Sequence, residues 1–254
     1  MGGNGIAYLG PLRGPSSREE LEIQWSYPVY TAPVVERDPN RSIAVESKRA
    51  LPMSEAFAQI AGDDPRPLLV LRECLTCTGT DDALLTRQSD NEKTMLMSRW
   101  FRCVKLPPAV IEDDHPFHAL FAGDDPPHLF VAQANGEMRA DLKGDQSRTE
   151  LWGKMESVLA ASYANKHVKA LKSIASLLDE FDAYDREFAE LNAKLAKELE
   201  KRGPKSSKVK KIQKEIDKLA GQKEELKREL AEAAQIPIKK AETAAAATST
   251  DDAA

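Results

Sequence analysis

The chain has 254 residues, of which 6% are aromatic and 30% are charged. So few large core side chains suit one compact domain with solvated extensions better than two full domains. The formal net charge of −5 gives no electrostatic reason to expect a nucleic-acid partner. No apolar run approaches the roughly 18 residues that span a bilayer, and residues 1–14 lack the features of a secretory signal. We therefore expect a cytoplasmic protein without a membrane partner.

The N-terminal part is poor in regular patterns. Residues 1–45 are rich in Gly, Pro, Ser and Arg, and they predict an irregular extension laid loosely over a domain that follows. Within the extension, Trp25 to Val35 has strand character. Pro28 and Pro33 restrict such a strand to the edge of a sheet.

Residues 46–160 alternate between helical and strand patterns, which is typical of an α/β domain. The spacing predicts a short helix from Pro52 to Ala61. The apolar run from Pro67 to Leu71 predicts a central strand that is buried on both faces. A helix from about Asp81 to Ser98 and a strand from Trp100 to Leu106 follow, with a connection long enough for a parallel crossover.

The second half of this domain has the pattern of a β-hairpin followed by a helix. His128 to Ala132 predicts a third strand, and Glu137 to Leu142 predicts its return strand. Asn135-Gly136 between them predicts a two-residue turn in which both residues take positive φ. Asp145 to Leu159 then predicts a helix with one apolar side.

Residues 161–235 predict two long charged helices. Apolar residues recur at steps of three, four or seven in the first helix, at Leu171, Ile174, Leu178, Phe181, Phe188, Leu191 and Leu195. Gly203 and Pro204 end it and Ser206 begins the next. The short connection predicts an antiparallel, coiled-coil-like helical hairpin. A basic run at Lys208, Lys210, Lys211 and Lys214 is interpreted as a solvated helix face, and residues 236–254 are expected to form a disordered tail.

The chain has three cysteines, an odd number that disfavours a secreted disulfide framework. Cys103 lies in a strand-like run and is expected to be a small buried hydrophobe. Cys74 and Cys77 have the CxxC spacing of a redox dithiol, although structural thiols or metal ligation fit the spacing as well. A zinc site would need two further ligands from His115, His118 and His128, and we expect no metal.

The order strand, CxxC, helix, strand, proline, hairpin and helix resembles the thioredoxin superfamily over Pro52 to Leu159. Three segments carry the resemblance. Cys74-Leu75-Thr76-Cys77 follows a strand and precedes a helix. The run from Cys103 to Leu106, with Lys105, resembles the family's central strand. Pro127-His128-Leu129-Phe130-Val131 and the downstream Asn135-Gly136-Glu137 resemble the segment where a cis-proline opens the hairpin.

The resemblance implies a thioredoxin-like mixed sheet flanked by helices, to which the helical hairpin predicted from the apolar spacing is added at the C-terminus. It implies Cys74 as the nucleophile and Cys77 as the resolving thiol. Pro127 matches the cis-proline, and the carbonyl of Pro126 would accept a hydrogen bond from an extended substrate. Lys105 and Glu73 would support the site. No cofactor is implied, and the partners would be protein disulfides or thiols.

Several departures from the family weaken the enzymatic interpretation. Glu73 stands where the family usually has an aromatic residue, and its charge disfavours a thiolate at Cys74. Leu75-Thr76 replaces the common Gly-Pro. The apolar strand lacks the buried acid of many relatives. The run from Thr78 to Asp81 can form a capping box, which would start the helix after the cysteine pair and away from Cys74.

Two functions remain open at the level of sequence. The first is thiol–disulfide exchange through Cys74 and Cys77, with the helical hairpin as an arm for partner binding or self-association. The second is a non-catalytic thioredoxin-like scaffold that acts through the hairpin.

Overall fold

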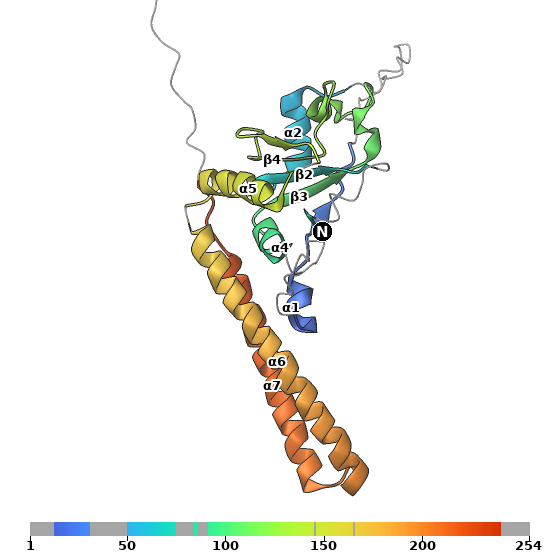
Figure 1. The fold of residues 1–254 in the computed structure, drawn as a ribbon, viewed down its shortest axis with the longest axis vertical. Helices are drawn as coiled ribbons and strands as arrows, with labels where there is room; N and C mark the ends of the chain where they lie inside the picture. The colour runs from blue at the N-terminus through green and yellow to red at the C-terminus, as the bar shows by residue number, and fades with distance from the viewer. Residues whose placement is uncertain are drawn as a thin grey trace, which may run out of the picture.

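A computed structural model describes residues 13–30, 50–74, 84–85, 91–144, 146–164 and 166–239. It is a mixed α/β structure with a five-stranded sheet (Figure 1). In chain order the elements are α1 (Pro15–Glu20), β1 (Trp25–Ser26), α2 (Met53–Ala61), β2 (Leu68–Arg72), α4 (Glu92–Ser98), β3 (Arg102–Leu106), η2 (Pro108–Ile111), η3 (His118–Phe121), β4 (Leu129–Ala132), β5 (Ala140–Leu142), α5 (Arg148–Ser162), α6 (His167–Arg202) and α7 (Ser207–Ala234).

The sheet has the strand order β1-β3-β2-β4-β5. Strands β1, β3 and β2 are parallel, whereas β4 is antiparallel to β2 and β5 is antiparallel to β4. The expected parallel pairing of the first two predicted strands is therefore confirmed as β2 with β3. Of the predicted edge strand from Trp25 to Val35, only Trp25 and Ser26 form a strand, β1, which pairs with β3; residues 27–30 are not strand, and residues 31–35 lie outside the described residues.

The continuous apolar sequence of β2 is explained by two cores, one on each face of the sheet. Leu68 and Val70 belong to a core with α2, η2 and η3, whereas Leu69 and Leu71 belong to a core with α4, α5 and the start of α6. All four side chains are at most 5% exposed. Because successive strand residues point to opposite faces, a strand covered on both sides loses the polar alternation of a surface strand.

The connection between β4 and β5 differs from the predicted two-residue turn. Among the described residues with side chains, only Met138 has positive φ, and Gly136 has a φ of 86°. Asn135 instead accepts a hydrogen bond from the Glu137 N–H through its side-chain oxygen. A Cβ on Gly136 would lie 2.7 Å from the ring of Phe57. Contact with α2 therefore shapes this loop, and residues 133–139 all lie outside the strands.

The N-terminal segment from Arg13 to Ser17 is held by specific contacts, contrary to the expected loose extension. Arg13 forms ion pairs with Glu92 of α4 and with Asp179 and Asp182 of α6, at 2.6 to 2.8 Å. The hydroxyl of Ser17 donates to Asp182, and the hydroxyl of Ser16 donates to Asp185 of the same helix. These contacts connect the N-terminal segment, the domain and α6.

Helices α6 and α7 are the longest elements and run side by side away from the sheet (Figure 1). Gly203 ends α6 with a φ of 72°, and Ser206 caps α7, as the sequence predicts. The first part of α6 belongs to the core through Ile174, Leu178 and Phe181. Farther out, α6 and α7 share a separate apolar cluster of Leu191, Ile216 and Leu219. Phe188, one of the apolar residues that recur along the first long helix, is 37% exposed.

Two of the predicted boundaries fall inside contiguous structure. The boundary at residue 160 lies within α5, and the indole N–H of Trp100 donates to the carbonyl of Ala234 at the end of α7. The expected disordered tail from residue 236 is wrong for residues 236–239. Ile238 bridges to Tyr163, and the backbone N–H of Lys239 donates to the carbonyl of Ser162. The domain and the long helices therefore share one core.

Candidate functional site

Cys74 lies two residues beyond the end of β2, at the edge where the parallel strands end. Carboxyl ends of parallel strands meet at one edge of a sheet, which is where ligands bind in many α/β proteins. Cys74 is half-buried and disulfide-bonded. Its predicted partner, Cys77, lies outside the described residues, as do Leu75-Thr76 and the predicted capping box from Thr78 to Asp81.

The pairing of β2 with β4 brings the Cys74 segment to the Pro126–Pro127 segment. Leu71 pairs with Leu129, and the backbone N–H of Arg72 donates to the carbonyl of His128 at 2.8 Å. The two segments thus meet at one edge. The peptide bond before Pro127 is trans, unlike the cis bond that the resemblance implies.

Arg72 joins the two segments, and sequence reasoning missed it. Its side chain is buried at the end of β2, and its guanidinium donates to the carbonyls of Pro127, at 3.3 Å, and Pro126, at 3.5 Å. These are long hydrogen bonds, yet they use the carbonyl of Pro126 that was expected to accept from a substrate. A charged residue directly after four apolar strand residues is the sequence signal that could have identified it, because arginine is rarely buried without partners.

Glu73 and Lys105 form an ion pair beside Cys74, at 3.7 Å. The backbone N–H of Glu73 donates to the carbonyl of Leu106, which fixes the chain just before the cysteine. The ammonium of Lys105 also lies 5.2 Å from the ring centroid of Trp25 on β1. Lys105 therefore offsets the negative charge that Glu73 brings to this edge. Among the described residues, Arg72 and Lys105 bring positive charge to this edge, and cations favour a thiolate.

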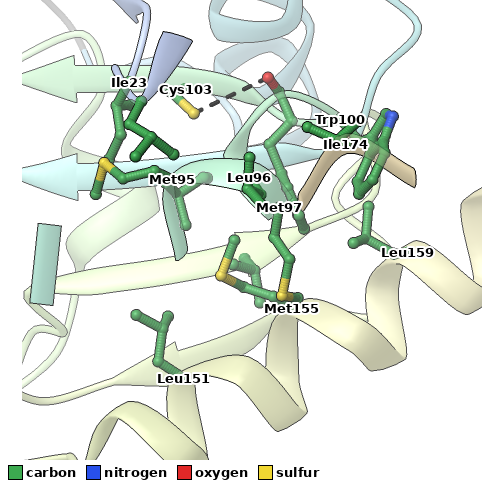
Figure 2. Close-up of a cluster of buried hydrophobic side chains, with 14 of the residues drawn as sticks. Ile23, Met95, Leu96, Met97, Trp100, Cys103, Leu151, Met155, Leu159 and Ile174 are labelled. Carbon is green, nitrogen blue, oxygen red and sulfur yellow. Dashed lines mark hydrogen bonds between the residues drawn. The ribbon is translucent and has the colours of Figure 1, made fainter. Parts of the chain in front are cut away.

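Cys103 is a free cysteine on β3 and is separate from this edge. It is 2% exposed, and Figure 2 shows its sulfur among apolar side chains, with a hydrogen bond to a backbone oxygen. Burial raises the pKa of the Cys103 thiol to about 12, so it stays protonated at neutral pH. The prediction of a small buried hydrophobe is confirmed.

The histidines considered as zinc ligands serve local structure. Nδ1 of His115 accepts a hydrogen bond from the backbone N–H of Phe117, and Nε2 of His118 lies 3.7 Å from Asp113. His128 directly precedes β4, and its backbone N–H donates to the carbonyl of Leu142. Within the residues that the structure describes, no three His, Cys, Asp or Glu side chains lie close enough to hold a metal ion.

Comparison of the chain with protein-family models, curated proteins and solved structures gives no match. Of the helices that the structure describes, none combines the length and the apolarity needed to cross a membrane. The candidate functional site is therefore the edge of the sheet formed by Arg72, Glu73, Cys74, Lys105 and Pro127.

Proposed function

We propose that the protein carries out thiol–disulfide exchange through Cys74 and Cys77 on a thioredoxin-like fold. One observation supports this most. Cys74 follows the end of a central strand, at the same edge of the sheet where the guanidinium of Arg72 donates to the carbonyls of Pro126 and Pro127. The described elements from β2 to α5 also follow the order on which the resemblance rests.

In the proposed reaction the Cys74 thiolate attacks one sulfur of a protein disulfide and displaces the other sulfur as a thiolate. Cys77 then attacks the Sγ of Cys74, which releases the second substrate thiol and leaves a Cys74–Cys77 disulfide. The substrate gains two electrons and the protein loses two, so an external dithiol must reduce the pair before the next cycle. Arg72 and Lys105 supply the positive charge that favours the attacking thiolate.

Reduction of insulin disulfides, with dithiothreitol as the final reductant, tests this proposal. We expect the protein to accelerate insulin precipitation and Cys74→Ser to abolish the acceleration, because the attacking sulfur is lost. Cys103→Ala is the matched control, since Cys103 is buried away from the edge, and it should keep the rate. A wild-type protein no faster than dithiothreitol alone, or an equally fast Cys74→Ser variant, would refute the proposal.

A second candidate is a non-catalytic thioredoxin-like scaffold that acts through a helical hairpin made of α6 and α7. Two observations favour it: the trans bond before Pro127, and the outer apolar cluster of α6 and α7, which is separate from the core of the domain. A scaffold would keep its partner binding in the Cys74→Ser variant. A scaffold would also give no acceleration of insulin reduction as the wild type, so the insulin assay distinguishes the two candidates.

A further inference from the structure

The outer end of the α6–α7 pair concentrates positive charge that the chain average conceals. Residues 194–218 contain ten basic and four acidic residues, a net charge of +6, in a chain whose total is −5. All ten basic side chains are exposed. Because α7 turns back along α6, this segment forms one end of the pair, far from the sheet (Figure 1). We call residues 194–218 the basic tip.

Four lysines of the basic tip form a stripe on one side of α7. At 100° per residue, Lys210, Lys211, Lys214 and Lys218 fall within an arc of about 100°. Val209, Ile216 and Leu219 are buried on the opposite side of the helix, so the stripe faces solvent. Three pairs in the stripe have helical spacings of three or four residues, at which like charges destabilise a helix. None of the four lysines forms an ion pair with any residue that the structure describes.

The composition of the basic tip indicates which class of partner it suits: a membrane surface, a protein or a phosphate-bearing polymer. Membrane-surface helices need an exposed apolar face, whereas the only large hydrophobic residue with notable exposure in this fully described segment is Leu199, at 38%. Protein interfaces rely on aromatic and arginine anchors, but the segment has no aromatic residue and a single arginine, Arg202, which pairs with Glu198 at 3.1 Å. Exposed lysines suit phosphates, which they contact as point charges.

We propose that the basic tip binds the phosphate backbone of double-stranded nucleic acid without reading its sequence. Single-strand binding uses aromatic side chains on which bases stack, and residues 194–218 contain none. The rest of the chain carries a net charge of −11 and repels a polyanion, so contact is limited to this end. The expectation drawn from net charge thus applies to the body of the molecule and not to its tip. This proposal is independent of the thiol chemistry.

Fluorescence anisotropy of a labelled DNA duplex of about 24 base pairs, titrated with the full-length protein between about 50 and 200 mM salt, tests the proposal. We expect binding that weakens linearly in a log–log plot against salt. We expect the triple variant Lys211→Gln/Lys214→Gln/Lys218→Gln to bind the duplex at least about tenfold more weakly. The slope of log affinity against log salt concentration should fall in magnitude by about 1 to 3, because each phosphate contact contributes about 0.9 to that slope.

The matched control is Lys166→Gln/Lys169→Gln/Lys172→Gln, which removes the same charge from exposed lysines at the other end of the pair. It should bind the duplex like the wild type. Circular dichroism should show equal helix content in both triple variants. An equal loss in both variants, no wild-type binding at low salt, tighter binding to a single strand, or binding only to phosphatidylserine vesicles would each overturn the proposal.

Discussion

Replacing Arg13 by alanine is expected to lower the free energy of unfolding by about 3 kcal/mol. The Arg13 side chain is 11% exposed and binds Glu92 and Asp182, which are 23% and 12% exposed. Breaking a buried ion pair leaves its partners desolvated without compensation, at a cost of about 3 to 5 kcal/mol. Asp179, at 73% exposure, adds little, which places the estimate at the lower end. Equilibrium unfolding in urea, followed by circular dichroism, measures the loss.

Arg228→Ala is the matched control for this prediction. Arg228 also pairs with two carboxylates, those of Glu225 and Glu232, but its side chain is 64% exposed. Exposed pairs contribute about 0 to 1 kcal/mol, so this variant should unfold close to the wild type. If both variants lose the same stability, the contact of the N-terminal segment with α6 is not a stabilising one.

The pH dependence of the free energy of unfolding provides a second test of the predicted effect of Arg13→Ala. Burial opposes ionisation of Asp182, but hydrogen bonds from Ser17, Arg13 and the backbone of Gly14 outweigh it and hold its pKa below the ordinary value. A carboxylate with a lowered folded pKa stabilises the protein above its unfolded pKa of about 3.9, and this stabilisation is lost as the pH falls through the folded pKa. The free energy of unfolding of Arg13→Ala should therefore fall furthest below that of the wild type at neutral pH, and this difference should shrink below about pH 4.

Replacing Arg72 by methionine is expected to slow insulin reduction by about tenfold, or 1.4 kcal/mol in the barrier. Methionine keeps the length and apolar character of the side chain while removing its charge and its hydrogen bonds to Pro126 and Pro127. The Cys74 segment then loses both a cation that favours the thiolate and the contact that positions it against β4. Initial rates in the insulin assay measure the effect.

Arg66→Met provides the matched substitution at the opposite end of the same strand. Arg66 precedes β2, pairs with Asp64 at 2.6 Å and donates to the carbonyl of Arg99. Its loss should reduce stability but leave the exchange rate unchanged. A rate for Arg72→Met equal to that of Arg66→Met would show that Arg72 acts only in stability.

The elements whose apolar residues repeat locally were predictable from the sequence. The apolar run from Pro67 to Leu71 predicted a strand covered on both faces, and the two cores that Leu68 to Leu71 join confirm it. The caps at Gly203 and Ser206 marked the ends of the long helices because they act within a few residues. Of the candidate site, the meeting of the Cys74 and Pro127 segments was predictable from the order of the strands.

Contacts between distant segments were not predictable in this way. Arg13 binds residues 79 to 169 positions away, and no periodic pattern marks such a pair. The role of Arg72 depends on two carbonyls more than 50 residues downstream. The prediction of a two-residue turn at Asn135-Gly136 was wrong because a neighbouring ring, that of Phe57, takes part in shaping the loop. Likewise, the charge of the basic tip is concentrated only when α7 folds back along α6.

The most direct measurement of the proposed chemistry is the pairing of cysteines after equilibration with glutathione buffers of graded potential, read by thiol alkylation and mass spectrometry. We predict that Cys74 and Cys77 lose their reactivity together, in one two-electron step, and are recovered in a single linked peptide while Cys103 remains a thiol. Separate glutathione adducts on Cys74 and Cys77, with no bond between the two at any potential, would contradict the proposal.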